Sequence, residues 1–159
     1  MQNFRKLRLG LFMVLICLVL GSSKVALAND LILSDLSGQS VNLSSYKGKQ
    51  IMLFFWTTWC PYCRKELKIL NEQYSVIAKE GILIVGVNVG ESMNKVQRFF
   101  KGYQLNFRML LDKDGFLADK YDLMGVPTYV FLDKSGEVIL QTNNLPVNYK
   151  SLFLERRLK

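Results

Sequence analysis

The sequence feature that most constrains the fold is an apolar run at residues 51–56, which two closely spaced cysteines and a helical pattern follow. The run Ile-Met-Leu-Phe-Phe-Trp has no charged residue, as expected of a central strand that is covered on both faces. Apolar residues then recur at helical spacing, which predicts a helix over Pro61–Lys79. Cys60 and Cys63 therefore stand where a buried strand gives way to an amphipathic helix.

The rest of the chain alternates between strand and helix patterns, without an internal repeat or a linker between domains. Short apolar segments around a Ser-Gly-Gln turn predict a β-hairpin ahead of the central strand. The further predicted elements are a strand at Ile82–Val89, a helix capped by Ser92, a short helix at 116–122, strands at Thr128–Leu132 and 137–141, and a last helix at 148–158. This order predicts the α/β class, with a mixed central β-sheet flanked by helices and an N-terminal β-hairpin extension.

The first 28 residues have the pattern of an export signal and are excluded from the predicted domain. A basic start precedes an apolar run at residues 9–20, which is too short to span a bilayer. The Ala26-Leu27-Ala28 sequence then offers a cleavage site. We therefore predict a signal peptide at 1–28 and one domain at 29–159, in the periplasm or otherwise outside the cytoplasm. The alternative is an uncleaved membrane anchor.

Composition excludes several classes of function. The chain has no histidine, which rules out an imidazole base and the common zinc hydrolase sites. The formal net charge is +8, but the leader holds four of the 21 Lys and Arg residues and no acid. The remaining chain has 17 basic and 13 acidic residues, a net charge of +4, and its basic residues are scattered. This distribution argues against a nucleic-acid partner.

The two cysteines have the spacing and the place of a redox pair. Free backbone N–H groups and the macrodipole at a helix N-terminus stabilise a thiolate, so they would lower the pKa of Cys60. Pro61 suits the first helical turn, where its missing N–H costs nothing. Cys63 lies one turn further on and could resolve a mixed disulfide.

Other uses of this pair fit less well. A structural disulfide would normally close a longer loop. A zinc site needs four ligands, and the domain holds no further cysteine or histidine to supply them. Covalent haem attachment needs histidine after the second cysteine, where Arg64 stands. We therefore expect no metal site and no cofactor apart from a redox-active Cys60–Cys63 disulfide.

Three separated motifs resemble the thioredoxin superfamily. The segment Trp-Thr-Thr-Trp-Cys-Pro-Tyr-Cys-Arg-Lys-Glu at residues 56–66 is similar to its active-site segment. The Gly-Val-Pro-Thr sequence at 125–128 resembles its cis-proline loop. The predicted hairpin and the Ser-Ser-Tyr-Lys-Gly-Lys sequence at 44–49 resemble the N-terminal extension of the TlpA-like branch, which includes ResA and the thioredoxins of cytochrome c maturation. The resemblance implies a thioredoxin fold over nearly all of the mature chain.

The resemblance also implies roles for the matching residues of the redox pair and its facing loop. Cys60 would be the exposed nucleophile, and Cys63 the buried resolving thiol. Pro127 would be a cis-proline that lies against the disulfide. Val126 would offer backbone hydrogen bonds to a bound peptide.

Residues around the cysteines would complete the site. Trp59, Pro61 and Tyr62 would contribute to the surface on which a substrate docks. Glu66 matches a glutamate that tunes the thiol pair and relays protons in TlpA-like proteins, and the alternative is a solvated surface carboxylate. The superfamily's other acid, on the preceding strand, is replaced by Phe54.

These features predict an exported thiol–disulfide oxidoreductase. We expect a protein-disulfide reductase that acts on cysteine pairs of other exported proteins, such as apocytochromes c, and that is re-reduced by a membrane electron donor. One alternative is an oxidase or isomerase with the same residues. Others are a thiol peroxidase, since Thr57 precedes Cys60 by three residues, a metal-delivery module and a purely structural domain.

Overall fold

The structure is a computed structural model, and it describes residues 31–155. The predicted leader at 1–28 lies outside the described residues. The elements in chain order are β1 (Ile32–Asp35), β2 (Ser40–Asn42), η1 (Leu43–Tyr46), β3 (Gln50–Trp56), α2 (Pro61–Lys79), β4 (Ile82–Val89), α3 (Met93–Phe99), β5 (Arg108–Asp112), α4 (Phe116–Lys120), β6 (Thr128–Leu132), β7 (Val138–Thr142) and α5 (Tyr149–Glu155).

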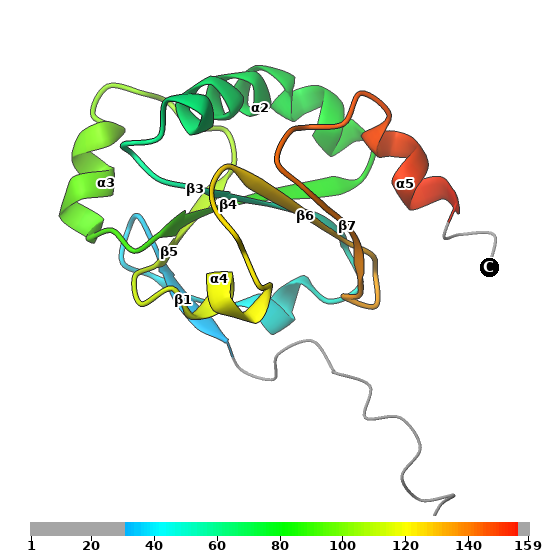
Figure 1. Cartoon of the computed structure of the whole chain (residues 1–159), viewed down its shortest axis with the longest axis horizontal. Coiled ribbons are helices and arrows are strands. Elements are labelled where there is room, and N and C mark those ends of the chain that lie inside the picture. Colours follow the sequence, from blue (N-terminus) through cyan, green and yellow to red (C-terminus); the bar gives the residue numbers. More distant parts are fainter. Residues whose placement is uncertain (1–30, 156–159) are drawn as a thin grey trace, which may run out of the picture.

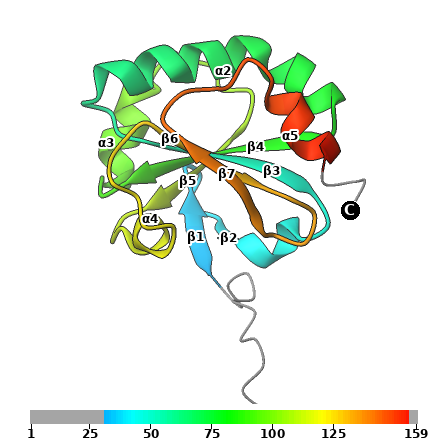
Figure 2. The same cartoon turned by 45° about the vertical axis from the view of Figure 1, so that its right-hand side comes forward.

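The strands form one mixed sheet in the order β2-β1-β5-β4-β3-β6-β7 (Figure 1). The central strands β3, β4 and β5 run parallel, whereas β6, β7, β1 and β2 pair antiparallel. The two termini of the described part lie at different ends of the molecule (Figure 2). The predicted α/β class, with its mixed sheet and N-terminal hairpin, is confirmed.

Helices cover both faces of the sheet (Figure 1). Helices α2, α3 and α5 pack on one face, around alternate residues of β3 such as Phe54 and Trp56. The short helices η1 and α4 pack on the other face, around Leu53 and Phe55. Every residue of β3 is buried, as its unbroken apolar run predicts. The strand is therefore fixed from both sides, and it delivers the following loop to one defined place.

Most predicted elements are present, and one strand was missed. Strand β5 was not predicted, yet it lies between β4 and β1 and joins the hairpin to the central sheet. Helix α2 has the predicted bounds, and Gly81 follows it with a φ of 79°, a conformation that glycine adopts at no steric cost. Ser92 is the N-cap of α3, although its side chain makes no capping hydrogen bond.

Candidate active site

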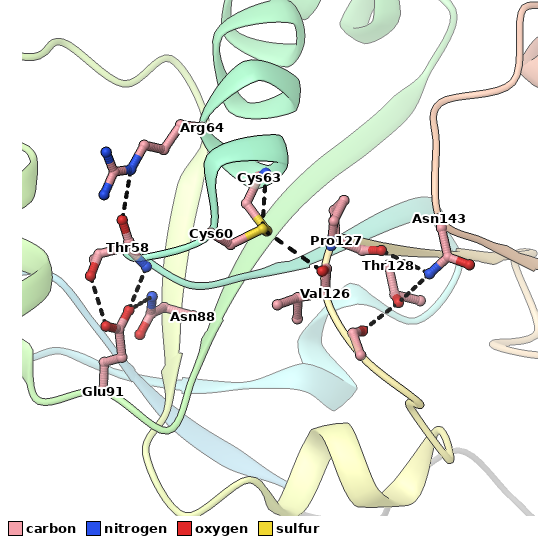
Figure 3. Close-up of a disulfide and its surroundings, with 11 residues drawn as sticks. Thr58, Cys60, Cys63, Arg64, Asn88, Glu91, Val126, Pro127, Thr128 and Asn143 are labelled. Atoms are coloured by element: carbon pink, nitrogen blue, oxygen red, sulfur yellow. Dashed lines mark hydrogen bonds between the residues drawn. A yellow bond between two sulfur atoms is a disulfide. The ribbon is translucent and has the colours of Figure 1, made fainter.

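Cys60 and Cys63 form a disulfide at the start of α2, with their Cα atoms 5.2 Å apart (Figure 3). Cys60 is the N-cap residue, and its Sγ accepts a hydrogen bond of 3.1 Å from the Cys63 N–H. Pro61 occupies the first helical position, as predicted. A negative charge that forms on Cys60 Sγ would therefore meet a backbone donor and the positive end of the helix dipole.

The nucleophile is less exposed than predicted. Cys63 is 0% exposed, as expected of a resolving thiol, but Cys60 is also buried, at 4%. The loop between α4 and β6 lies against it, with the Val126 carbonyl oxygen 3.7 Å from Cys60 Sγ (Figure 3). Cys60 Sγ is thus bordered by the backbone of the facing loop.

The facing loop has the predicted cis peptide bond between Val126 and Pro127. Polar contacts hold the loop in place. The Thr128 hydroxyl donates to the Gly125 carbonyl at 2.7 Å. The Asn143 amide of the chain after β7 donates to the Pro127 carbonyl at 2.9 Å and contacts Thr128 Oγ1 at 3.2 Å. Sequence reasoning did not find Asn143, because it stands in a polar segment whose partner lies 16 residues earlier.

Large apolar side chains are exposed next to the disulfide in the chain. Trp59 is 63% exposed and Tyr62 is 76% exposed, and Pro61 between the cysteines is also exposed. Met124, two residues before Val126 in the facing loop, is 99% exposed. Exposed apolar residues of this size, beside the disulfide and in the facing loop, could contact an apolar ligand.

Glu66 is half-buried and accepts a hydrogen bond of 2.6 Å from the Tyr129 hydroxyl of β6. It is therefore not the fully solvated carboxylate of the alternative interpretation. Burial raises the pKa of Tyr129 above its ordinary value, and the Glu66 carboxylate adds to that effect. Phe54, in the place of the superfamily's other acid, packs against Tyr129 with ring centroids 5.0 Å apart.

A second buried carboxylate, which sequence reasoning missed, lies close by. Glu91 is 5% exposed and accepts hydrogen bonds of 2.7 Å from Thr58 N–H, from the Thr58 hydroxyl and from the Asn88 amide (Figure 3). Lys95 makes an ion pair of 2.7 Å with it. Burial alone would raise the pKa of Glu91, but the hydrogen bonds from Asn88, Lys95 and Thr58 outweigh it and leave that pKa lowered.

The described residues hold no cluster of three or more cysteine, aspartate or glutamate side chains that could bind a metal ion. Likewise, no helix within residues 31–155 combines the length and the apolar character that crossing a membrane requires.

The sheet order, the cysteine pair that opens the first long helix and the cis-proline facing it define a thiol–disulfide oxidoreductase with the thioredoxin fold. The chain belongs to the AhpC/TSA family, whose model matches residues 26–141. The predicted resemblance to the thioredoxin superfamily and its ResA-like branch is confirmed by this match and by the relatives described next.

Among curated proteins, the thiol-disulfide oxidoreductase ResA of Bacillus subtilis (strain 168) is 36% identical in an alignment of 153 residues that covers 87% of this chain and 86% of that protein. ResA of Geobacillus kaustophilus (strain HTA426) is 39% identical over 111 residues, which are 70% of this chain and 64% of that protein.

Two solved structures show the same fold. A secreted Mycobacterium tuberculosis disulfide oxidoreductase, described as homologous to E. coli DsbE, superposes with a TM-score of 0.64 at 30% identity over 74% of this chain and 85% of that one. StoA from Bacillus subtilis superposes with a TM-score of 0.67 at 26% identity over 80% of this chain and 98% of that one.

Proposed function

We propose that this chain is an exported protein-disulfide reductase that acts on cysteine pairs of other exported proteins. The observation that carries the proposal is the Cys60–Cys63 pair at the N-terminus of α2, where a backbone N–H donor and the helix dipole favour a thiolate. The pair itself supplies the two electrons, so the proposed reaction needs no further cofactor.

The reaction proceeds by two thiol–disulfide exchanges. The Cys60 thiolate attacks one sulfur of a substrate disulfide, which forms a mixed disulfide and releases the first substrate thiolate. The Cys63 thiolate then attacks Cys60 Sγ, which forms the Cys60–Cys63 disulfide and releases the second substrate thiolate. The substrate gains two electrons, and an external dithiol must return two electrons to the pair.

The surface around the pair supports binding of an extended peptide. We assign the docking contacts to Val126, whose backbone borders Cys60, and to Pro127 next to it. The exposed Trp59, Pro61 and Tyr62 would contact the side chains that flank the substrate cysteine.

Glu66 is proposed as the group that exchanges a proton with Cys63. It lies one turn beyond Cys63 on α2, and the Tyr129 hydroxyl holds its carboxylate at 2.6 Å. Glu66→Gln keeps an oxygen acceptor for that hydroxyl but cannot take up a proton. We expect it to slow the release of the mixed disulfide more than its formation, which rapid-mixing kinetics with a peptide disulfide would resolve.

Export and the direction of electron flow are further parts of the proposal. The predicted signal peptide and the description of a similar M. tuberculosis protein as secreted support a place outside the cytoplasm. A reductase there works against an oxidising environment, so we propose a membrane electron donor. Apocytochromes c, whose cysteine pairs must be reduced before haem attachment, are the proposed example of a substrate.

The test combines a potential with a trapping variant. A reduction potential near about −270 mV, like that of thioredoxin, would support a reductase, whereas one near about −120 mV would make the protein a donor of disulfides. Cys63→Ser should trap substrates as mixed disulfides on Cys60, and Cys60→Ser should trap none. A pair that consumes peroxide, or that binds copper without exchanging disulfides, would refute the proposal.

A further inference from the structure

Glu91 is a buried ionised group that the proposed exchange reaction does not use. It stands in the connection from β4 to α3 and accepts hydrogen bonds from two residues in addition to its ion pair with Lys95. Its side chain is 4% exposed, whereas that of Lys95 is 48% exposed. A carboxylate is costly to bury, and a well-packed apolar residue usually stabilises a fold as well as a buried ion pair does. Fold stability requires an acceptor for the buried donors of Thr58, but it does not by itself require an ionised one.

The contacts of Glu91 converge on Thr58, two residues before the nucleophile. Both the N–H and the hydroxyl of Thr58 donate to the carboxylate, one to each oxygen. The Thr58 carbonyl accepts a hydrogen bond of 2.8 Å from Arg64 Nε, in the first turn of α2. Every polar group of Thr58 is therefore occupied, from β4–α3 on one side and from α2 on the other (Figure 3).

Backbone hydrogen bonds connect this loop to Cys60. The Arg64 N–H donates to the Cys60 carbonyl at 3.2 Å, and the Cys60 N–H donates to the Thr57 carbonyl at 3.4 Å. The loop from Thr57 to Cys60 is thus held at one end by the contacts of Thr58 and at the other by the first turn of α2, where Cys60 Sγ accepts from the Cys63 N–H.

We propose that Glu91 is a positioning residue for disulfide exchange: by holding Thr58, its carboxylate keeps Cys60 Sγ aligned with the N-terminus of α2, where the thiolate is stabilised. This proposal rests on the exchange reaction proposed above. The charge of Glu91 is offset by Lys95, so the contribution assigned to Glu91 is geometric rather than electrostatic.

Loss of the Glu91 charge and loss of its hydrogen bonds to Thr58 would shift the pKa of the Cys60 thiol in opposite directions. Glu91→Gln alone would leave Lys95 without its partner, and the unopposed positive charge would lower the pKa of the Cys60 thiol. Loss of alignment would raise it, because the thiolate would lose its backbone donor and the helix dipole. The double variant Glu91→Gln/Lys95→Met keeps the net charge of the pair and still puts an amide N–H₂ among the donors of Thr58.

The experiment measures thiolate formation in the reduced full chain by ultraviolet absorbance across a pH titration, with Cys60→Ser as the reference that isolates Cys60. We expect the double variant to raise the titration midpoint of Cys60 by about one pH unit. Below both midpoints the thiolate is then about tenfold rarer, and since a more basic thiolate is more nucleophilic, attack on an aromatic disulfide should slow about threefold.

Three controls separate position from stability and charge. Lys95→Met alone keeps both hydrogen bonds to Thr58 but leaves the Glu91 carboxylate unopposed, so it measures the effect of charge without loss of alignment, and it should raise the Cys60 midpoint less than the double variant does. Glu80→Gln/Lys150→Met makes the same changes in an ion pair of 2.7 Å at the other end of α2 and should leave the Cys60 midpoint unchanged. Thr58→Val removes one of the two donors and should give a smaller rise of the midpoint than the double variant.

Two results would overturn the proposal. One is a double variant whose midpoint and attack rate equal those of the wild type, even if its melting temperature falls. The other is a Cys60 midpoint that falls in Glu91→Gln and returns to the wild-type value in the double variant, because Glu91 would then act through its charge. If the double variant does not fold, an unchanged midpoint in Thr58→Val has the same consequence. A wild-type chain that does not exchange at all would refute the proposed function, independently of Glu91.

Discussion

The hydrogen bond between Tyr129 and Glu66 leads to a prediction that can be worked through quantitatively. Tyr129→Phe removes only the hydroxyl and keeps the ring that packs on Phe54 and Phe131. A hydrogen bond to a charged group contributes about 1.5–3 kcal/mol. Because Glu66 is half-buried and water can replace the hydroxyl, we expect the free energy of unfolding to fall by about 1.5 kcal/mol at neutral pH.

The same variant should change how stability depends on alkaline pH. Burial and the Glu66 carboxylate raise the pKa of Tyr129 in the folded state. Its contribution is therefore fully present below the unfolded pKa of about 10 and is lost as the pH rises through the folded value. Above pH 10, this residue alone lowers the free energy of unfolding of the wild type by about 1.4 kcal/mol per pH unit. The wild type and Tyr129→Phe should therefore reach equal free energies of unfolding about one pH unit higher.

Urea unfolding across a pH series measures both effects. Tyr121→Phe is the matched control, since burial raises the pKa of Tyr121 to about 12 but no hydrogen bond of its hydroxyl occurs within the described residues. It should cost little at neutral pH. The reasoning would be refuted if Tyr129→Phe unfolded with the wild-type free energy at neutral pH. It would also be refuted if the effects of Tyr129→Phe and Glu66→Ala simply added in the double variant.

Two further outcomes concern stability. Burial would raise the pKa of Glu91, but hydrogen bonds, of which that from Asn88 is the strongest, leave this pKa lowered. The contribution of Glu91 to stability is therefore present above the ordinary pKa of 4.5 and is lost as the pH falls through the folded pKa. The free energy of unfolding of the wild type should therefore fall more steeply below about pH 4.5 than that of Glu91→Gln, which has no carboxylate to protonate at this position. Parallel acid titrations of the two proteins would contradict this. Gly86→Ala should cost about 2–4 kcal/mol in urea unfolding, because the added Cβ would overlap the thioether of Met109, whose Sδ accepts the Trp56 indole N–H at 2.9 Å. A cost below about 1 kcal/mol would mean that Met109 moves aside without losing that contact.

Local patterns were sufficient for the elements that carry the redox pair. The unbroken apolar run predicts β3, and the proline and glycine at either end of the helical pattern predict the bounds of α2. Strand β5 was missed because its five residues include only three apolar ones between an arginine and an aspartate. Its place is set by tertiary pairing with β4 on one side and β1 on the other, and a single-sequence pattern does not contain that information.

Some features of the candidate site could likewise be predicted from local sequence, and others could not. The cysteine pair, the cis-proline and Glu66 could be named from motifs, because each motif is local. The contact of Cys60 with the facing loop could not be predicted in this way, since the carbonyl of Val126 lies 66 residues further along the chain. Tyr129 was assigned only to a strand, and its hydroxyl gains a partner because β6 lies beside β3 and under α2.

The role of Glu91 could have been predicted from the sheet topology, although the local sequence pattern does not indicate it. In the chain it stands between a glycine and the N-cap serine of α3, where an acid is usually solvated. However, β3 and β4 are parallel neighbours in which Trp56 pairs with Asn88, so their carboxyl ends lie at the same edge of the sheet. Any polar residue just after β4 therefore meets the loop just after β3, whose free N–H and hydroxyl at Thr58 need an acceptor. The charge of an acid at that place is offset by a lysine four residues later, in the first turn of α3.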